Sequence, residues 1–423
     1  MSPAPEVVIT GMGIISPIGI GREAFWDSLA AGRSGVRPYQ SFDASGCGVR
    51  FGAEVLGFDP KAFVRPRKSL KVMAREIQLG FAAAEMALAD AGFSPSIVAP
   101  ERLGVVFGAD TIYSELAEWL PVYRRAMVEG EFEYARWAPS VMSELYPLWL
   151  LKYLPNMAAC HVAIAHDARG HNNSIVMAEV SSLLAVAEGM RIIERGQADM
   201  MIVGAASAMR VHPTSLIFHG DALLSRRNDN PAGACRPFDA DRDGMVNGEG
   251  AAAFILETRQ HSERRGARAL ARILAASSRF EPVRDGQSLR GTAIQQSIVA
   301  ALDAARLRPS EIGHVNAHGD GTIEHDRAEA QAIHEVLGNV PVTAPKSFFG
   351  NLGAASGAVE IAVSLLAFER GRIAATLNYS RPDPECPVNV VHGAAEPSGK
   401  PVALLLNQAP SGQSAALLLA AHS

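Results

Sequence analysis

Cysteine is scarce in this sequence, and the numbers of positively and negatively charged residues are nearly equal. The 423 residues include four cysteines, 6% aromatic residues and a net charge of −5. The cysteines are too scattered for a disulfide framework or a cysteine metal site; they are Cys47, Cys160, Cys235 and Cys386. We therefore expect no bound metal and a reducing, cytoplasmic location.

Export and membrane signals are also missing. The chain runs from Met1 into the apolar stretch Val7–Thr10 without a basic-then-apolar leader. No apolar run approaches the roughly 20 residues that cross a bilayer. A net charge of −5 gives no overall attraction to nucleic acid or to an anionic membrane. We expect no nucleic-acid partner and no membrane span.

What the sequence does contain is the pattern of an α/β protein. Hydrophobic residues make up 48% of the chain and charged residues 20%, which is typical of a globular protein. Short apolar segments alternate with helical ones from end to end, which indicates buried sheets. The clearest strands are predicted at Leu103–Gly108, Asp199–Gly204, Ala251–Leu256, His314–Ala317, Val402–Leu406 and Ala415–Ala420.

A helix-then-strand unit occurs twice and suggests an internal duplication. The predicted helix Ser181–Arg195 leads into the strand Asp199–Gly204, and the helix Gly357–Glu369 leads into another apolar strand. The length also exceeds that of one ordinary domain. We place the boundary in the charged stretch Arg259–Arg268, which gives halves of residues 1–258 and 259–423; the same stretch also reads as a solvated helix face.

The first half carries an aromatic-rich insertion at about residues 113–153. It holds three of the four tryptophans: Trp119, Trp137 and Trp149. A segment this apolar is expected to be shielded from water by other parts of the protein or by a partner. Core packing or a subunit interface is favoured over a ligand pocket.

Four further stretches carry a family resemblance. They are V-V-I-T-G-M-G-I-I-S-P-I-G (7–19), F-D-A-S-G-C-G-V-R-F-G-A-E-V (42–55), S-R-R-N-D-N-P with R-P-F-D-A-D-R-D-G-M-V-N-G-E-G (within 225–250), and P-D-P-E-C-P-V-N-V-V (382–391). In this order they resemble the elongating β-ketoacyl-acyl-carrier-protein synthases. The resemblance implies a thiolase-type, five-layered αβαβα fold built from two similar halves.

The resemblance also implies partners and chemistry. Substrates would be thioesters on the phosphopantetheine arm of an acyl carrier protein, so the chain itself needs no cofactor. The assembly would be a homodimer, or a heterodimer with an active ketosynthase. Family members acylate a cysteine at the start of a buried helix, and they decarboxylate malonyl-carrier with the help of two histidines.

Glutamate stands where that cysteine is expected. The family phrase resembles S-x-x-T-A-C-A, and residues 174–180 read S-I-V-M-A-E-V, which places Glu179 in the cysteine's position. A helix N-terminus favours a carboxylate as it does a thiolate, but carboxylate attack would give only a mixed anhydride. We expect no self-acylation. Read alone, Glu179 is an ordinary N-terminal helix acid, and Cys160, in an apolar helical pattern, is a packing cysteine and not a substitute nucleophile.

Two histidine motifs are expected after the second-half strands. The first resembles H-G-T-x-T and here reads H-G-D-G-T from His318, with Asp326 and Glu329 following; a lone histidine is more often structural, but these neighbours favour function. The second resembles K-S-x-x-G-H and keeps Lys346 and the later Glu360, whereas Asn351 replaces its histidine. Asparagine donates a hydrogen bond but cannot shuttle a proton. Initiating condensing enzymes resemble this arrangement.

Two further segments complete the predicted site. The family's C-terminal gate resembles N-S-F-G-F-G-G-T-N, and residues 407–415 read N-Q-A-P-S-G-Q-S-A, so Ser411 and Gly412 form the substrate and oxyanion loop. Carriers are acidic, so a local basic patch is needed to dock them. We assign it to Arg65, Arg67, Lys68 and Lys71, with Arg124 and Arg125 adding to it; a solvated helix face is the alternative.

Three functions follow from these motifs. The chain is a decarboxylase or a chain-length-factor-like partner of an active synthase, a catalyst using Glu179 as general base, or a non-catalytic scaffold that binds a carrier or partner. The retained His318 and Lys346 favour an enzyme, although ordinary condensation is not expected. We also expect Glu179 and His318 to lie near hydrogen-bonding reach, as a carboxylate–imidazolium pair.

Overall fold

The computed structural model describes residues 5–218, 222–283 and 289–422. In these residues one large sheet runs through the molecule, because β1 of the first half pairs with β11 of the second. In the first half the strand order is β8 (Asn172–Ile175), β5 (Leu103–Gly108), β9 (Met200–Ser207), β10 (Gly250–Thr258) and β1 (Val7–Ser16), with β2 (Gly19–Ile20) beside β1. It continues as β11 (Ala271–Phe280), β18 (Gln413–Ala421), β17 (Val402–Gln408), β12 (His314–Asn316), β13 (Pro341–Thr343) and β15 (Asn389–Val390).

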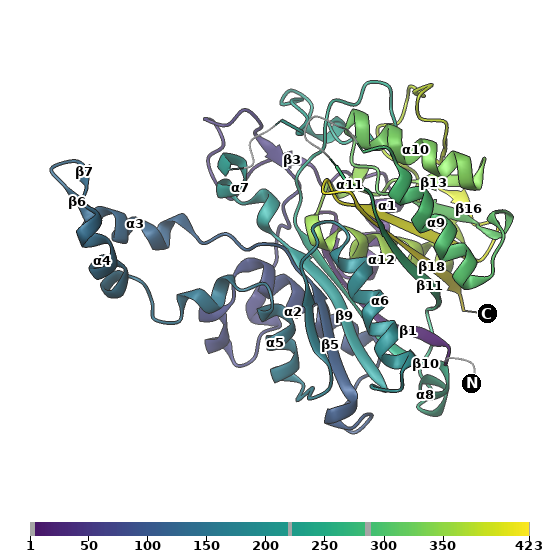
Figure 1. Ribbon diagram of the computed structural model, residues 1–423, viewed down its shortest axis with the longest axis horizontal. Coiled ribbons are helices and arrows are strands. Elements are labelled where there is room, and N and C mark those ends of the chain that lie inside the picture. Colours follow the sequence, from purple (N-terminus) through teal and green to yellow (C-terminus); the bar gives the residue numbers. More distant parts are fainter. Residues whose placement is uncertain (1–4, 219–221, 284–288, 423) are drawn as a thin grey trace.

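Three layers of helices alternate with the two halves of this sheet, which gives the five-layered thiolase-type αβαβα fold (Figure 1). α2 (Arg75–Asp90) and α5 (Met157–Ala165) cover the outer face of the first half. α6 (Ser181–Glu194) and α12 (Ser356–Arg370) are buried between the two halves. α9 (Thr292–Ala305) and α10 (Ile323–Leu337) cover the outer face of the second half. None of the helices in the described ranges is both long and apolar enough to cross a bilayer.

The remaining elements are short or lie outside these layers. The helices are α1 (Arg22–Ala30), α3 (Leu116–Ala126), α4 (Trp137–Glu144), α7 (Pro213–Phe218), α8 (Arg259–Arg264) and α11 (Lys346–Phe349). The strand pairs are β3 (Arg37–Pro38) with β4 (Phe51–Gly52), β6 (Met127–Val128) with β7 (Glu131–Phe132), and β14 (Arg372–Ile373) with β16 (Glu396–Pro397).

The strands are apolar on both faces because both faces are covered. In β9, Met201 and Val203 join the core around α6, whereas Met200 and Ile202 join the core around α2. This alternation is the two-residue period of a strand. Strands buried on both sides read as continuous apolar runs, which is why they were recognisable in the sequence.

All six predicted strands are present, with ends shifted by at most three residues. Both helices of the suggested repeat are also present, as α6 and α12. The apolar strand expected directly after the second helix was wrong. The two-residue β14 follows α12 and pairs outside the large sheet. The proline-rich stretch that follows it cannot supply a ladder of N–H donors, so the chain next joins the large sheet at the two-residue β15, before the longer β17.

The aromatic-rich insertion projects from the body as an arm containing α3, α4 and the β6–β7 hairpin (Figure 1). Its tryptophans pack on one another: Trp119 stacks on Trp137 with ring centroids 5.6 Å apart and meets Trp149 edge-on at 5.1 Å. Other apolar side chains of the arm face solvent, with Tyr134 81% and Met142 84% exposed. The arm has a small core of its own and an uncovered apolar surface.

Candidate functional site

The site forms where parallel strands of both halves end. β5, β8 and β9 are parallel neighbours, and their carboxyl ends lead to Asp110, Glu179 and Arg210. In the second half, β12 and β13 are parallel and lead to His318 and Lys346. Loops after the carboxyl ends of adjacent parallel strands meet at one edge of a sheet, which is the usual place for a site in an α/β fold.

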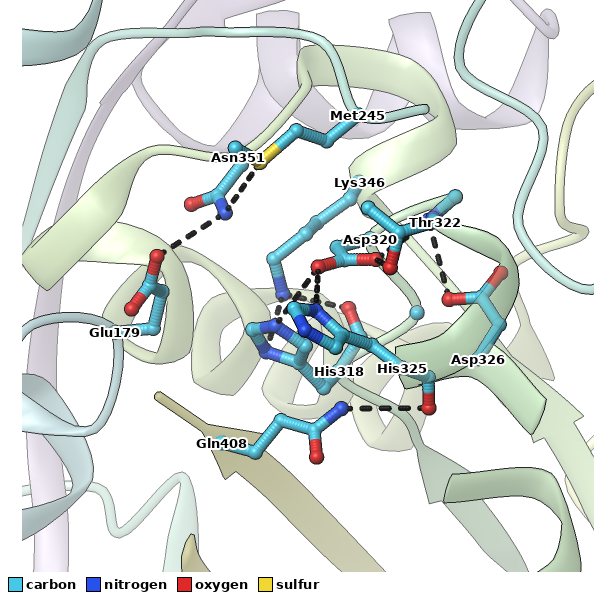
Figure 2. Close-up of polar contacts among 12 residues, drawn as sticks. Glu179, Met245, His318, Asp320, Thr322, His325, Asp326, Lys346, Asn351 and Gln408 are labelled. Atoms are coloured by element: carbon cyan, nitrogen blue, oxygen red, sulfur yellow. Dashed lines mark hydrogen bonds and ion pairs between the residues drawn. The ribbon is translucent and has the colours of Figure 1, made fainter. Parts of the chain in front are cut away.

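Glu179 lies in the tight connection between β8 and the buried helix α6 and is 1% exposed. The preceding residue, Ala178, has a left-handed backbone with φ of 49°, a conformation that costs energy for a residue with a side chain. The Glu179 Oε1 atom accepts a hydrogen bond from Nη2 of Arg210. It accepts a second one, at 3.3 Å, from Nδ2 of Asn351, which Figure 2 shows. The Oε2 atom has no hydrogen-bond partner among the described residues.

The expected Glu179–His318 pair was wrong. The carboxylate is engaged by Arg210 and Asn351, and it makes no hydrogen bond to the histidine within the described part of the chain. Burial, together with the nearby charge of Lys346, holds the pKa of His318 well below its ordinary value, so the ring is neutral at pH 7. An arginine that the sequence reading did not consider therefore provides the positive charge.

Arg210 belongs to a buried acidic cluster. Asp110 Oδ2 accepts hydrogen bonds from Ser207 Oγ and from the backbone N–H of Ala354, both at 2.8 Å. Burial raises the pKa of Asp110, an effect that the charge of Arg210 opposes. Burial and the neighbouring Asp110 raise the pKa of Glu76 well above its ordinary value. The sequence feature that could have pointed to this cluster is Arg210, an arginine three residues after the apolar strand β9.

His318 is oriented by Lys346. The Lys346 Nζ atom lies 3.2 Å from His318 Nδ1 and 2.6 Å from the His318 carbonyl oxygen, and it pairs with Glu360. An ammonium group can only donate, so Nδ1 is the acceptor and the proton of the neutral ring is on Nε2. Burial raises the pKa of Glu360, and Lys346 opposes this shift. Asn407 Nδ2 donates to the other Glu360 oxygen at 2.7 Å.

Asp326 and Glu329 hold the loop that carries His318. Glu329 accepts the backbone N–H groups of His318 at 2.7 Å and Gly319 at 2.8 Å. Asp326 accepts the N–H of Gly321 at 3.1 Å. Burial raises the pKa of Glu329 to about 8 and that of Asp326 to about 7. Both acids are buried beneath the loop and act on its backbone.

A second histidine lies beside His318, and the sequence reading missed it. His325, in the first turn of α10, has Nδ1 2.9 Å from Asp320 Oδ2, and His318 Nε2 is 3.8 Å from the same oxygen (Figure 2). Asp320 Oδ1 accepts hydrogen bonds from the N–H and the hydroxyl of Thr322, both at 2.8 Å. Asp320 stands where the family phrase has threonine.

Asn351 connects the histidine loops to a cavity. Its Oδ1 accepts the N–H of Gly353 at 2.9 Å, and its Nδ2 also lies 3.6 Å from the sulfur of Met245. Met245 and Arg210 line a cavity of about 330 Å³. Its other lining residues are Met209, Ser215, Ala222, Leu223, Leu224, Asn247 and Pro410.

The predicted oxyanion loop is a tight turn between β17 and β18. Gly412 has φ of 95°, and its N–H donates to Ala409 O at 2.9 Å. The N–H of Gly412 is therefore used within the turn, and Pro410 occupies the second position of the turn, as its fixed φ favours. Ser411 is exposed at the tip of the turn. Of Ser411 and Gly412, only Ser411 therefore has a backbone N–H that is free, within the described residues, to donate to a substrate.

None of the cysteines is placed as a nucleophile; the buried Cys235 thiol donates to the carbonyl oxygen of Lys346 at 3.0 Å. Cys160 is half-buried on α5, which covers the opposite face of the sheet from α6. Burial raises the pKa of the Cys235 thiol far above its ordinary value and that of Cys386 to about 12. In the described residues, no group of three or more His, Cys, Asp or Glu side chains is placed to hold a metal ion.

The predicted docking residues form an exposed basic surface. Arg65, Arg67, Lys68 and Lys71 are all exposed, and the last three lie in the 3-10 helix Arg67–Val72. Arg124 and Arg125 are exposed on the arm, where Arg125 pairs with Glu144 at 2.8 Å. Neither set contributes a side chain to the buried site.

Comparison with known proteins identifies the relatives of this chain. A model described as the β-ketoacyl synthase N-terminal domain matches residues 4–262, and one described as the C-terminal domain matches residues 270–380. The tetracenomycin polyketide synthase ketoacyl synthase alpha subunit of Streptomyces glaucescens is 35% identical, over 98% of this chain and 96% of its own length.

Solved structures agree with this over the whole chain. The ishigamide ketosynthase/chain length factor superposes with a TM-score of 0.88 at 28% identity and covers 100% of both chains. A type II polyketide synthase acyl-carrier protein in complex with its ketosynthase bound to the hexaketide gives a TM-score of 0.84 at 27% identity, covering 99% of this chain and 100% of that chain.

Proposed function

Because this chain belongs to the β-ketoacyl synthase family of fatty-acid and polyketide biosynthesis, we propose that it acts on thioesters carried by an acyl carrier protein without forming an acyl-enzyme. The observation that carries the proposal is the state of Glu179. It occupies the strained turn before the buried helix α6, and Arg210 binds its carboxylate. We assign this position to the cysteine of the family motif. A carboxylate held in this way is a poor nucleophile.

Decarboxylation of malonyl-carrier is the reaction that this site supports best. Loss of carbon dioxide leaves an enolate whose oxygen must be stabilised by hydrogen-bond donors. His318 carries its proton on Nε2, and the 3.8 Å to Asp320 is too long for a hydrogen bond, so this donor remains free. The long 3.3 Å bond from Asn351 to Glu179 is readily exchanged for a substrate oxygen. Each donor contributes roughly 3 kcal/mol to the transition state.

Intact-mass measurement tests this proposal. Purified protein is incubated with malonyl-carrier, and the carrier is expected to lose carbon dioxide and become acetyl-carrier while the mass of the protein stays unchanged. An unchanged malonyl-carrier, alone and with an active ketosynthase added, would contradict the decarboxylase assignment.

Replacing Glu179 with cysteine is expected to create a site that becomes acylated. The thiol would lie at the N-terminus of α6 and near Arg210, both of which favour a thiolate. Incubation of Glu179→Cys with acyl-carrier should add one acyl group, which peptide mapping places at residue 179. The wild type should gain none. An acyl group on wild-type Glu179 or Cys160 would refute the non-acylating mechanism.

A general-base role for Glu179 has less support. Its Oε1 atom already accepts hydrogen bonds from both Arg210 and Asn351, and these contacts occupy that oxygen. The role of a partner subunit has a specific observation in its favour. The projecting arm exposes apolar side chains that would be buried in a dimer, whether with a second copy or with an active ketosynthase.

Reversing two charges of the basic surface is expected to weaken carrier binding. Arg67 and Lys68 are exposed and make no ion pair with any described residue, so they are free to meet an acidic carrier. The double variant Arg67→Glu/Lys68→Glu should raise the Kd at low salt and reduce its dependence on ionic strength, as measured by titration calorimetry. Arg306→Glu, far along the chain at the end of α9, is the control and should bind normally. Unchanged binding by the double variant would discard this docking surface.

A further inference from the structure

The proposed decarboxylation needs a proton donor that His318, Asn351 and Lys346 do not provide. After carbon dioxide leaves, the α-carbon of the enolate must take up a proton to give the acetyl thioester. His318 is neutral, and its one ring proton is used for the hydrogen bond to the enolate oxygen. Asn351 can donate a hydrogen bond but cannot release a proton. Lys346 is directed at His318 and Glu360.

His325 is a second histidine at the same carboxylate. Its Nδ1 donates to Asp320 Oδ2 at 2.9 Å, while Nε2 of His318 faces that oxygen from 3.8 Å. The two rings are therefore brought to one side-chain oxygen from different elements: His318 follows β12, and His325 lies in the first turn of α10. Asp320 is fixed in turn by the N–H and hydroxyl of Thr322.

The charges around His325 favour its protonated form. Burial opposes a charge on the ring, whereas the carboxylates of Asp320, Asp326 and Glu179 stabilise it. The balance raises the pKa of His325 to about 9. Although burial favours the neutral acid for Asp320, the contacts with His325 and Thr322 hold the pKa of Asp320 well below its ordinary value. The result is a buried carboxylate–imidazolium pair, of the kind expected for Glu179 and His318 but formed by other residues.

Solvent access differs between the two histidines. The side chain of His325 is 15% exposed, whereas those of His318 and Asp320 are each 3% exposed. Water can therefore reach His325 and restore its proton after each turnover, and His318 stays shielded. The two rings thus suit different tasks, one as a fixed hydrogen-bond donor and the other as an exchangeable acid.

We propose that His325, held as an imidazolium by Asp320, is the proton donor that completes decarboxylation in a site where Asn351 replaces the family's second histidine. This role rests on the proposed function. The C–C bond to the carboxylate breaks, carbon dioxide leaves, and the electron pair forms the enolate. The α-carbon then takes the Nε2 proton of His325, while Nδ1–H stays hydrogen-bonded to Asp320, which gives acetyl-carrier and neutral imidazole. A solvent proton restores the imidazolium.

Kinetics with a single substitution test the proposal. His325→Asn keeps a polar side chain of similar shape but has no exchangeable acid, and it should lower kcat for acetyl-carrier formation about a hundredfold, with KM little changed. The wild-type kcat should fall as the pH rises through about 9, because the imidazolium loses its proton there, and His325→Asn should lack this alkaline limb. His334→Gln, an exposed histidine on the same helix, is the matched control and should keep the wild-type rate and profile.

A histidine titration by NMR gives a readout that does not depend on turnover. The ring signal that disappears in both His325→Asn and His325→Gln should titrate near pH 9 in the wild type, and well below that in Asp320→Asn. A signal titrating at 6.5 or lower overturns the inference, as does an unchanged rate and pH profile in a folded His325→Asn protein. Absence of carbon dioxide release from every protein, wild type included, overturns instead the proposed function on which this role rests.

Discussion

Replacing His318 with alanine is expected to lower the rate of carbon dioxide release from malonyl-carrier about a hundredfold or more. The substitution removes the Nε2–H donor to the enolate oxygen, and it leaves Lys346 without one of its acceptors. Lys346 still pairs with Glu360 and with the backbone carbonyl of residue 318, so the loop retains its main contacts. The rate is measured from radiolabelled carbon dioxide released by malonyl-carrier.

Two comparisons show whether the effect is specific to the donor. Asn351→Ala removes the second donor and should also slow the reaction strongly, whereas His392→Ala, which changes an exposed ring packed against Tyr379, should not. Because burial and Lys346 lower the pKa of His318, its contribution should persist when the pH is lowered from 7 toward 6. A His318→Ala protein that decarboxylates at the wild-type rate would rule out this histidine as the donor.

Replacing Arg210 with methionine is expected to lower the free energy of unfolding by about 3–5 kcal/mol. Glu179 is 1% exposed, and Arg210 is the only cation in hydrogen-bonding contact with it among the described residues. The variant leaves a buried carboxylate without its counter-ion, next to Asp110, which adds further negative charge. Chemical denaturation of wild type and variant, followed by circular dichroism, measures the difference.

A double variant separates the cost of the unpaired charge from the loss of packing. Arg210→Met combined with Glu179→Leu removes both charges, and we expect it to recover most of the lost stability, as buried ion pairs replaced by apolar groups commonly do. Arg195→Met is the control. That side chain is 56% exposed and lies 3.9 Å from Glu188, and removing it should cost less than about 1 kcal/mol. A similar loss in Arg195→Met and Arg210→Met would mean that the Glu179–Arg210 pair has no special importance.

Much of the architecture was predictable because it depends on local patterns. Strands such as Leu103–Gly108 are apolar on both faces and were located to within a few residues. The helix α6 follows from its apolar period over residues 181–194. The five-layered fold came from the family resemblance and agrees with the structure. The prediction of an apolar strand directly after α12 was wrong, because proline and polar residues redirect the chain there. The spacing of helices and strands alone did not reveal this effect.

The family and the loops that carry the site could be assigned from the sequence, because motifs such as those around His318 and Lys346 are contiguous in the chain. The tertiary structure decided which charges pair. Glu179 meets Arg210 because β8 and β9 both lie beside β5 in parallel, so residues 31 positions apart emerge at one edge. His325, and not His318, is the imidazolium of the buried pair because the first turn of α10 brings its ring to the carboxylate of Asp320. Electrostatic energy depends on the distance between charges and on their burial, and neither quantity can be derived from the order of the residues alone.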